Sequence, residues 1–252
     1  MNKLPIISSG ITVGSYSEIV DNFFNLVAEK QSSYVCICNV HMLIEAYDSP
    51  SFGKIVNNAD MVTPDGMPVA KGVSWLYGVK QPRAAGMDLI ESLFSEIMHR
   101  EMKVFLFGST DDVLQAITKK AKKQFPTLNI VGVLSPPFRE LSEEEKRLMV
   151  EEINRVEPDF VFVALGCPKQ EKWMAEHRGL IRGCMVGLGG AFPVYAGTVA
   201  RSPSWMQNNG LEWLYRLYKE PRRLWRRYFH TNTKFIWLFG VQYIKQKIFK
   251  TR

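Results

Sequence analysis

The sequence contains few cysteines, and their spacing excludes a zinc site or a disulfide framework. The four are Cys36, Cys38, Cys167 and Cys184, with no C-x-x-C pair and no Cys/His cluster. Three of them lie in strongly apolar runs, which is typical of buried, reduced thiols. The N-terminal residues also lack the apolar core and the cleavage site of a signal peptide. We therefore expect a reducing, cytoplasmic compartment.

Long hydrophobic runs are absent as well. The longest uncharged stretch covers residues 183–200, but it contains five glycines and Pro193, which make it a poor spanning helix. The next candidate, residues 235–244, is only ten residues long and is flanked by lysines. The sequence therefore predicts no transmembrane helix.

Several common catalytic motifs are also missing. There is no D-x-D clamp for a nucleotide-bound divalent metal, no P-loop, no G-x-S-x-G elbow and no H-E-x-x-H pair. The four histidines are scattered along the chain, which favours structural or solvated roles. We expect no metal and no cofactor, so chemistry on a phosphate would have to neutralise charge with arginines and backbone dipoles.

The composition is that of an ordinary globular protein, but the charge is uneven. The 252 residues are 46% hydrophobic and 23% charged, which excludes the disordered and collagenous classes. Residues 201–252 hold twelve Lys/Arg, two acids and four of the six tryptophans, whereas the other 200 residues hold 20 basic and 23 acidic ones. We therefore predict a catalytic body over residues 1–200 and a basic, aromatic appendage over residues 201–252. Such an appendage favours a polyanionic partner, namely lipid headgroups, phosphates or nucleic acid.

The body alternates strand-like and helical patterns. Continuous apolar runs, typical of strands covered on both faces, occupy residues 34–39, 103–108, 129–134, 159–166 and 184–188. Helical patterns occupy residues 17–30, 87–100, 142–156 and 169–178 and, in the appendage, residues 211–218, 222–230 and 234–250. This alternation predicts a Rossmann-like parallel α/β sheet with flanking helices and a helical C-terminal appendage.

Polar or glycine-rich loops follow the predicted strands, where ligands of parallel sheets bind. Asn39 ends the first strand, and Gly108 begins a strand-to-helix turn that suits phosphate. Residues 166–171 (GCPKQE) and 187–192 (GLGGAF) follow the last two strands. Each loop also has a plain alternative, an ordinary helix start or a tight turn.

Asp65 stands apart from these loops. It lies in a turn that Pro64, Gly66 and Pro68 make rigid. A carboxylate on a stiff loop is suited to general-base catalysis. The alternative is a turn aspartate that bonds its own backbone.

Two basic clusters occupy different parts of the appendage. Five arginines fall within residues 216–227, and the planar guanidinium group binds phosphate through paired hydrogen bonds. The last helical pattern, over residues 235–249, mixes aromatic and aliphatic residues with lysines, which suits the surface of an anionic bilayer. A solvated basic face and a helix packed on the body are the respective alternatives.

Taken in order, these segments resemble the WecG/TagA/CpsF glycosyltransferase family from about residue 34 to residue 228. The matching segments are Asn39, residues 59–60 (AD), 64–68 (PDGMP), 83–88 (RAAGMD), 165–171 (LGCPKQE), 189–205 (GGAF…G…RSP…W) and 210–228 (GLEW…RL…EPRR…RRY). Each segment alone is weak, but their order and spacing are specific.

The resemblance implies an inverting, metal-independent transfer of a sugar, of N-acetylmannosamine type or a related hexose, from a UDP-sugar. The implied acceptor is an undecaprenyl-diphosphate-linked N-acetylglucosamine or a similar lipid-linked sugar, used for teichoic acid or another cell-surface polysaccharide. Asp65 matches the family's proposed base. The other implied catalytic residues are Arg83, Arg216, Arg223 and Arg226. The implied substrate-binding residues are Asn39, Gly108, Gly166, Lys169, Gln170, Gly189, Gly190 and Arg201.

The resemblance also implies a location. The appendage arginines would close over the site, and the appendage would hold the enzyme on the anionic inner face of the bacterial cell membrane. We expect no nucleic-acid partner and leave self-association open.

Two positions depart from the family's pattern. Ile37 stands where threonine is usual, and Pro193 stands where aspartate is usual. Both lie near the expected donor pocket, so the donor sugar stays undetermined. Two rival functions stay open: a nucleic-acid-binding protein that uses the basic tail, against which the near-neutral body argues, and a UDP-sugar hydrolase or epimerase on a similar sheet.

Overall fold

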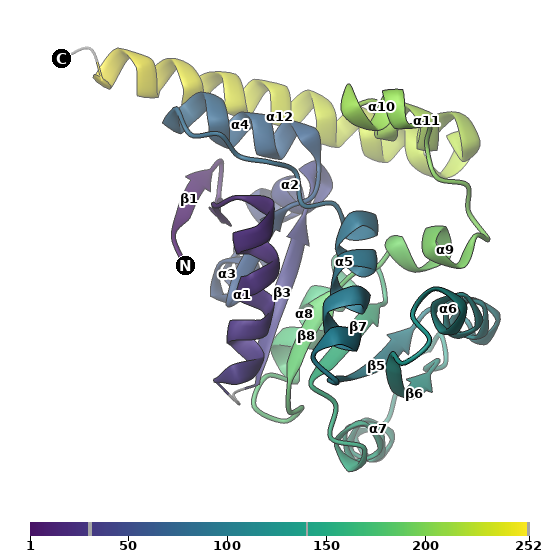
Figure 1. The fold of residues 1–252 in the computed structure, drawn as a ribbon. Helices are drawn as coiled ribbons and strands as arrows, with labels where there is room; N and C mark the ends of the chain where they lie inside the picture. Colours follow the sequence, from purple (N-terminus) through teal and green to yellow (C-terminus); the bar gives the residue numbers. More distant parts are fainter. Residues whose placement is uncertain (30–31, 140, 251–252) are drawn as a thin grey trace. The chain divides into compact units, whose positions relative to one another are not determined.

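The computed structural model describes residues 1–29, 32–139 and 141–250, with the side chains of residues 249 and 250 excepted. A six-stranded parallel sheet in the order β4-β3-β8-β7-β5-β6 is flanked by helices, and β1 and β2 form a separate antiparallel hairpin (Figure 1). This confirms the predicted Rossmann-like α/β fold. Of the predicted helical segments, Lys30 and the side chain of Lys250 lie outside the described residues.

The predicted strands of the sheet are present, with bounds within two residues of those expected. The strands in the described part of the chain are β1 (Lys3–Ile6), β2 (Ser9–Thr12), β3 (Ser33–Cys38), β4 (Met61–Pro64), β5 (Lys103–Gly108), β6 (Asn129–Leu134), β7 (Phe160–Ala164) and β8 (Cys184–Gly187). The register places Val104 opposite Phe160 and Phe160 opposite Cys184. β4 and the hairpin were not predicted from the sequence, because a proline or a glycine interrupts each short apolar run: Pro5 in β1, Gly10 in β2 and Pro64 in β4.

The helices surround this sheet and build the appendage. Those in the described residues are α1 (Tyr16–Ala28), α2 (Val40–Asp48), α3 (Pro50–Asn58), α4 (Met67–Tyr77), α5 (Gly86–His99), α6 (Asp111–Gln124), α7 (Glu143–Arg155), α8 (Lys169–Glu176), α9 (Ala191–Ala196), α10 (Ser204–Asn208), α11 (Glu212–Lys219) and α12 (Pro221–Lys250). α7 begins with the predicted capping box, in which Ser142 and Glu145 exchange side-chain and backbone hydrogen bonds.

One strand differs from its prediction. Residues 129–134 were expected to form a buried strand, but β6 is the last strand in the sheet order. Its residues are mostly half-exposed, and Val133 is 44% exposed, whereas β7 is buried throughout. An edge strand has a neighbour on one side only, so its apolar run is not covered as the run of a central strand is.

The chain divides into two compact units. Unit 1 consists of Met1–Ile19, Ile37–Ala85 and Arg201–Arg252, and unit 2 consists of Val20–Cys36 and Gly86–Ala200. One junction between the units follows Ala200. Unit 2 has an aromatic core in which the Phe94 ring stacks on Phe162 at 5.5 Å and meets Tyr195 edge-on at 5.5 Å. The Tyr195 hydroxyl is satisfied by a 2.7 Å hydrogen bond to Gln124.

In unit 1, α12 packs along α2 and α4 (Figure 1). The predicted helices over residues 222–230 and 234–250 are one continuous helix, so the predicted interruption is wrong. Thr231 is buried within this helix, and its hydroxyl is satisfied by a 2.9 Å hydrogen bond to the Arg227 carbonyl. Leu224 and Phe235 are buried on the same helix and fix it to the unit. Within the described residues, no helix is both long and apolar enough to span a bilayer.

Candidate functional site

Asp65 and Asn39 lie side by side at the carboxyl ends of two neighbouring strands. Asn39 follows β3 and caps α2, where its side-chain oxygen accepts from the Met42 backbone N–H at 3.1 Å. Its amide nitrogen then points to Asp65 and donates to the carboxylate at 3.5 Å. Asp65 follows β4 and is half-buried. Two residues that the sequence placed 26 positions apart are thus brought into contact.

Backbone hydrogen bonds hold this carboxylate in place. The Asp65 N–H donates to the Cys38 carbonyl at 2.9 Å, which extends the β3–β4 ladder by one residue. The Pro64 carbonyl accepts from the Ala84 N–H at 2.8 Å, so the Asp65 turn and the loop after α4 are joined. With Pro64 fixing the chain on one side and α4 beginning at Met67 on the other, the turn has little freedom.

Arg83 lies on that same loop and pairs with the appendage. Its guanidinium group meets the Glu212 carboxylate at 2.5 Å, and the Arg83 side chain is only 11% exposed. The other Glu212 oxygen accepts from the Ser202 hydroxyl at 3.5 Å. Residue 201, a predicted substrate contact, is exposed next to buried Ser202 at the start of the appendage. Glu212 therefore ties the appendage to the loop that also supports Asp65.

Unit 2 carries the glycine-rich loops, and Gln170 joins two of them. Its side-chain oxygen accepts from the Gly166 N–H at 3.2 Å after β7, and its amide nitrogen donates to the Gly187 carbonyl at 3.1 Å at the end of β8. A Cβ at Gly189 would lie 2.8 Å from the Gln170 side-chain oxygen, so this turn requires glycine. Gln170 is 4% exposed and holds the loops together, while Lys169 and Gly190 are exposed beside it.

Gly108 has a different setting. It is buried at the end of β5 with φ +98°, and a Cβ there would lie 2.6 Å from the Ala164 carbonyl oxygen. The helix that follows carries Asp111 and Asp112 in its first turn, and these carboxylates already oppose an incoming anion. The exposed Gly166 and Gly190 loops are therefore better placed than Gly108 to receive a diphosphate.

Comparison with known proteins identifies the family of the chain. Residues 4–249 match the family described as "Glycosyl transferase WecG/TagA/CpsF family". The chain belongs to this family. It is 29% identical over 228 residues to an N-acetylglucosaminyldiphosphoundecaprenol N-acetyl-beta-D-mannosaminyltransferase of Bacillus subtilis, covering 90% of this chain and 85% of that one. It is 32% identical over 229 residues to the enzyme of the same name from Bacillus spizizenii, with the same coverage. The chain is accordingly a glycosyltransferase.

Two of the three predicted appendage arginines of the glycosyltransferase, Arg216 and Arg223, act on one acid, Glu220. Arg223 pairs with Glu220 at 2.6 Å, and this hydrogen bond lowers the pKa of the Glu220 carboxyl and raises that of Arg223. The charge of Arg216 also lowers the pKa of Glu220. The Arg226 guanidinium lies 5.4 Å from the centre of the Trp225 ring. These arginines lie at the junction of α11 and α12, where Pro221 begins the second helix. Arg216, Arg223 and Arg226 are all exposed, so they are accessible to a solvent-borne anion.

Three carboxylates of the site were not singled out from the sequence. Two of them stand out in the sequence, because Glu212 and Glu220 are the only acids among residues 201–252. In the structure each pairs with a predicted site arginine. The third, Glu171, is fully buried and accepts from the Gln170 amide at 2.7 Å. Glu171 was visible only as part of a motif, since nothing in the local pattern indicates burial of an acid.

The two positions that depart from the family pattern are occupied by structural residues. Ile37 is buried in β3, two residues before Asn39, and adds to the core. Pro193 lies in the first half of α9, and its carbonyl accepts from the Val199 N–H and the Thr198 hydroxyl, both at 3.0 Å. Neither side chain can donate a hydrogen bond to a ligand.

Replacement of Glu212 by glutamine tests the tie between the appendage and the Arg83 loop. We expect kcat/KM for sugar transfer to fall about tenfold or more, because a hydrogen bond to a charged group contributes roughly 1.5–3 kcal/mol. Steady-state kinetics of the Glu212→Gln variant measures this. Glu152→Gln, at an exposed position on α7, is the control and should keep full activity. An unchanged kcat/KM in Glu212→Gln would show that the ion pair does not support the site.

Proposed function

We propose that this glycosyltransferase transfers a sugar of N-acetylmannosamine type from a UDP-sugar to an undecaprenyl-diphosphate-linked N-acetylglucosamine, with inversion and without a metal. The observation that carries the proposal is the Asp65 carboxylate, held beside the Asn39 amide on a turn fixed by backbone hydrogen bonds. The relatives' names state the same acceptor and the same transferred sugar for those proteins.

In the proposed reaction, Asp65 takes the proton from the acceptor hydroxyl as its oxygen attacks the anomeric carbon of the donor. The new carbon–oxygen bond forms on the face opposite the leaving group, and the bond to UDP breaks with its electron pair remaining on the diphosphate. The Asn39 amide orients the carboxylate. A one-step displacement of this kind inverts the configuration of the anomeric carbon.

The charge of the departing diphosphate needs neutralising. Within unit 1, Arg216 on α11 and Arg223 and Arg226 in the first two turns of α12 supply exposed cations. Within unit 2, the Gly166 and Gly190 loops expose backbone at the strand ends. Oriented N–H groups and arginines stabilise a developing anion without a metal ion. Arg83, with Glu212 beside it, adds a buried cation to the Asp65 side of the site.

A transfer assay tests the reaction. Purified enzyme is incubated with UDP-N-acetylmannosamine and a lipid-linked N-acetylglucosamine diphosphate, with and without EDTA. We expect UDP release only when the acceptor is present, and equal rates with and without the chelator. UDP release without acceptor would instead indicate a hydrolase, and loss of activity in EDTA would contradict metal independence.

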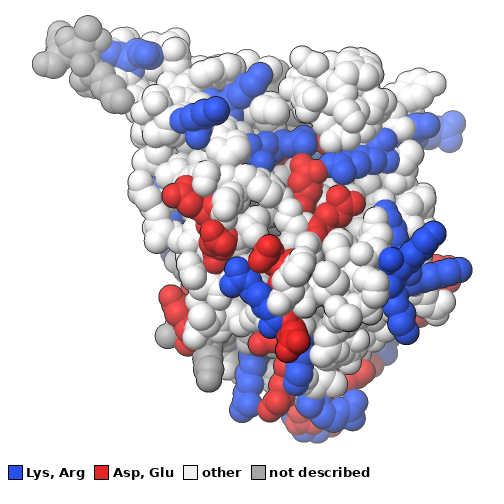
Figure 2. Space-filling model, in the orientation of Figure 1, with Lys and Arg blue, Asp and Glu red and all other residues white. Residues whose placement is uncertain are grey.

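We also propose that α12 holds the enzyme on the anionic inner face of the cell membrane. Lys and Arg side chains lie among uncharged ones in the upper part of the molecule, where Figure 1 draws α4, α10, α11 and α12 (Figure 2). Trp237, Ile244 and Ile248 are each more than half exposed there, and Lys245 and Lys247 are exposed beside them. Exposed aromatic and aliphatic residues flanked by lysines are suited to the bilayer interface.

Removal of two of these charges gives a direct prediction. The double variant Lys245→Gln/Lys247→Gln should bind anionic vesicles about thirtyfold more weakly, since each basic residue near such a surface contributes about 1 kcal/mol. Vesicle flotation measures the change. Lys122→Gln/Lys123→Gln on α6 removes the same charge from an exposed part of unit 2 and should bind like the unaltered protein. Equal losses in both variants would show that net charge, not α12, governs binding.

A further inference from the structure

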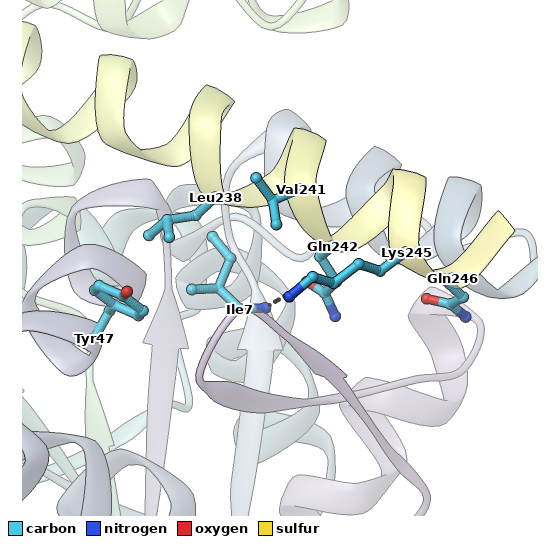
Figure 3. A pocket seen from close by; sticks show the side chains of 7 residues that line it. All are labelled: Ile7, Tyr47, Leu238, Val241, Gln242, Lys245 and Gln246. Carbon is cyan, nitrogen blue, oxygen red and sulfur yellow. Dashed lines mark hydrogen bonds between the residues drawn. The ribbon is translucent and has the colours of Figure 1, made fainter. Parts of the chain in front are cut away.

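A shallow groove of about 500 Å³ runs along α12 beside the turn of the N-terminal hairpin. Its lining includes Ile7 from the hairpin, Tyr47 from the last turn of α2, and Leu238, Val241, Gln242 and Lys245 from α12 (Figure 3). All of these residues belong to unit 1. The groove is separate from the Asp65–Asn39 pair and has no part in the proposed reaction steps.

The surface of this groove is mainly apolar. The Gln242 amide is engaged at both ends, because its oxygen accepts from the Ile7 N–H at 2.7 Å and its nitrogen donates to the Pro5 carbonyl at 3.2 Å. Gln246, which also lines the groove, donates to the Leu76 carbonyl at 2.9 Å. An occupant therefore meets aliphatic side chains and a tyrosine ring. A peptide would bring backbone N–H and C=O groups that need partners, whereas a hydrocarbon chain would bring none.

Ile7 places an apolar side chain in the groove although its backbone conformation is unfavourable for isoleucine. It has φ +57° in the two-residue turn between β1 and β2. A β-branched residue is strained in the left-handed region of backbone conformation, which glycine and asparagine adopt readily. Its hydrogen bond to Gln242 holds the strained turn against α12. Backbone strain of this kind persists where the surrounding structure fixes it, and such positions cluster at ligand sites.

The groove is continuous with the exposed apolar stripe of α12. The stripe consists of Trp237, Ile244 and Ile248, and Leu238 and Lys245 line the groove. At about 100° of rotation per residue around the helix, Val241 lies between these two sets. A hydrocarbon chain could thus pass from a bilayer at the stripe into the groove without crossing polar surface. Lys245 places a cation at the rim, as suits anionic headgroups beside the chain.

The distance between the groove and the Asp65–Asn39 pair matches the length of a sugar diphosphate. Asn39 caps the N-terminus of α2 and Tyr47 lies in its last turn, so the two are separated by roughly 12 Å along the helix at 1.5 Å per residue. A sugar and a diphosphate occupy a span of this order. We propose that the groove receives the first isoprene units of the acceptor's polyprenyl chain. This inference rests on the proposed function, because it assumes a lipid-linked acceptor.

Two acceptors distinguish lipid binding in the groove from the transfer reaction itself. One is N-acetylglucosamine diphosphate on a polyprenyl chain, the other is the same head group on a butyl chain, and both are used in detergent micelles. Leu238→Glu and Val241→Glu should each raise KM for the polyprenyl acceptor about tenfold, because contact with roughly two methylene groups is lost. KM for the butyl acceptor should not change. Ile236→Glu, at an exposed position of α12 outside both the groove and the stripe, is the matched control and should leave both KM values unchanged in micelles. An equal KM for the polyprenyl acceptor in all variants would overturn the proposal.

A second measurement does not depend on turnover. A polyprenyl diphosphate with a diazirine near its head is photolysed with the full-length enzyme, and the labelled peptides are mapped by mass spectrometry. Labelling of Ile7, Tyr47 or Leu238, competed by unlabelled polyprenyl diphosphate but not by excess phospholipid, supports the groove. Labelling confined to Trp237, Ile244 and Ile248 overturns it, and so does competition by phospholipid. If no acceptor is glycosylated but the groove is labelled, the proposed function fails while the lipid site stands.

Discussion

Replacement of Asp65 by asparagine is expected to lower kcat by a factor of about 10²–10⁴, the usual contribution of a general base. Asparagine has the shape of aspartate and keeps the backbone hydrogen bond from residue 65 to the Cys38 carbonyl. Asp65 is half-buried at the end of a short strand, so the fold should tolerate the change. The loss should therefore appear in turnover and not in the thermal unfolding temperature.

The controls for this result are on the same segment. Asp60→Asn changes the acid just before β4, five residues before the candidate base, and should keep near-normal turnover. The pH dependence of kcat/KM adds a second readout, because loss of the base should remove the acidic limb of the profile. Near-normal turnover by a folded Asp65→Asn variant would exclude Asp65 as the base, and another group beside the acceptor would then have to accept the proton.

The sequence was most informative where the chain is most regular. The apolar runs that became β5, β7 and β8 are central strands, and burial on both faces removes the alternation that would otherwise mark a strand. β4 was missed because only Met61, Val62 and Thr63 precede the two prolines of the Asp65 turn. That omission hid the reason why Asp65 and Asn39 meet, which is that β3 and β4 are neighbours.

The site could be predicted only as a set of loops, not as a set of contacts. Gln170 was expected to hold the donor, and its buried amide bonds the Gly166 and Gly187 backbone. A motif shows that a residue is required but not whether it touches the ligand or supports the loop that does. The Arg83–Glu212 pair joins residues 129 positions apart. No local pattern predicts a contact between residues so far apart in the sequence, because it depends on how the appendage packs within unit 1.

Replacement of the buried Glu171 by glutamine should stabilise the protein above neutral pH. Burial raises the pKa of the Glu171 carboxyl from 4.5 to about 7, because an apolar setting disfavours the charged form, and hydrogen bonds from Gln170 and Cys167 oppose this only in part. Between these two values the unfolded chain has lost the proton and the folded chain keeps it. Stability therefore falls as the pH rises through this window. The full loss, above pH 7, is about 3 kcal/mol.

Urea unfolding from pH 5 to pH 8 measures this effect. The Glu171→Gln variant should lose most of the decline in stability and exceed the unaltered protein by up to about 3 kcal/mol at pH 8, with little difference at pH 5. Glu176→Gln, an exposed position on the same helix, removes the same charge and should show no such change. Identical pH profiles for the Glu171→Gln variant and the unaltered protein would show that the buried carboxyl does not titrate in this range.

The outcome also bears on why a glycosyltransferase keeps an acid where it weakens the fold. The Glu171 oxygen that accepts from Gln170 fixes which end of that amide faces Gly187 and which faces Gly166. Glutamine at position 171 offers an oxygen or a nitrogen to Gln170, so the Gln170 amide could turn over and the two loops would lose their defined contacts. We therefore expect the stabilised variant to bind UDP-sugar more weakly, as an increase in KM without a matching fall in kcat. A variant that is more stable and equally active would show that the orientation of the Gln170 amide does not depend on the Glu171 carboxylate.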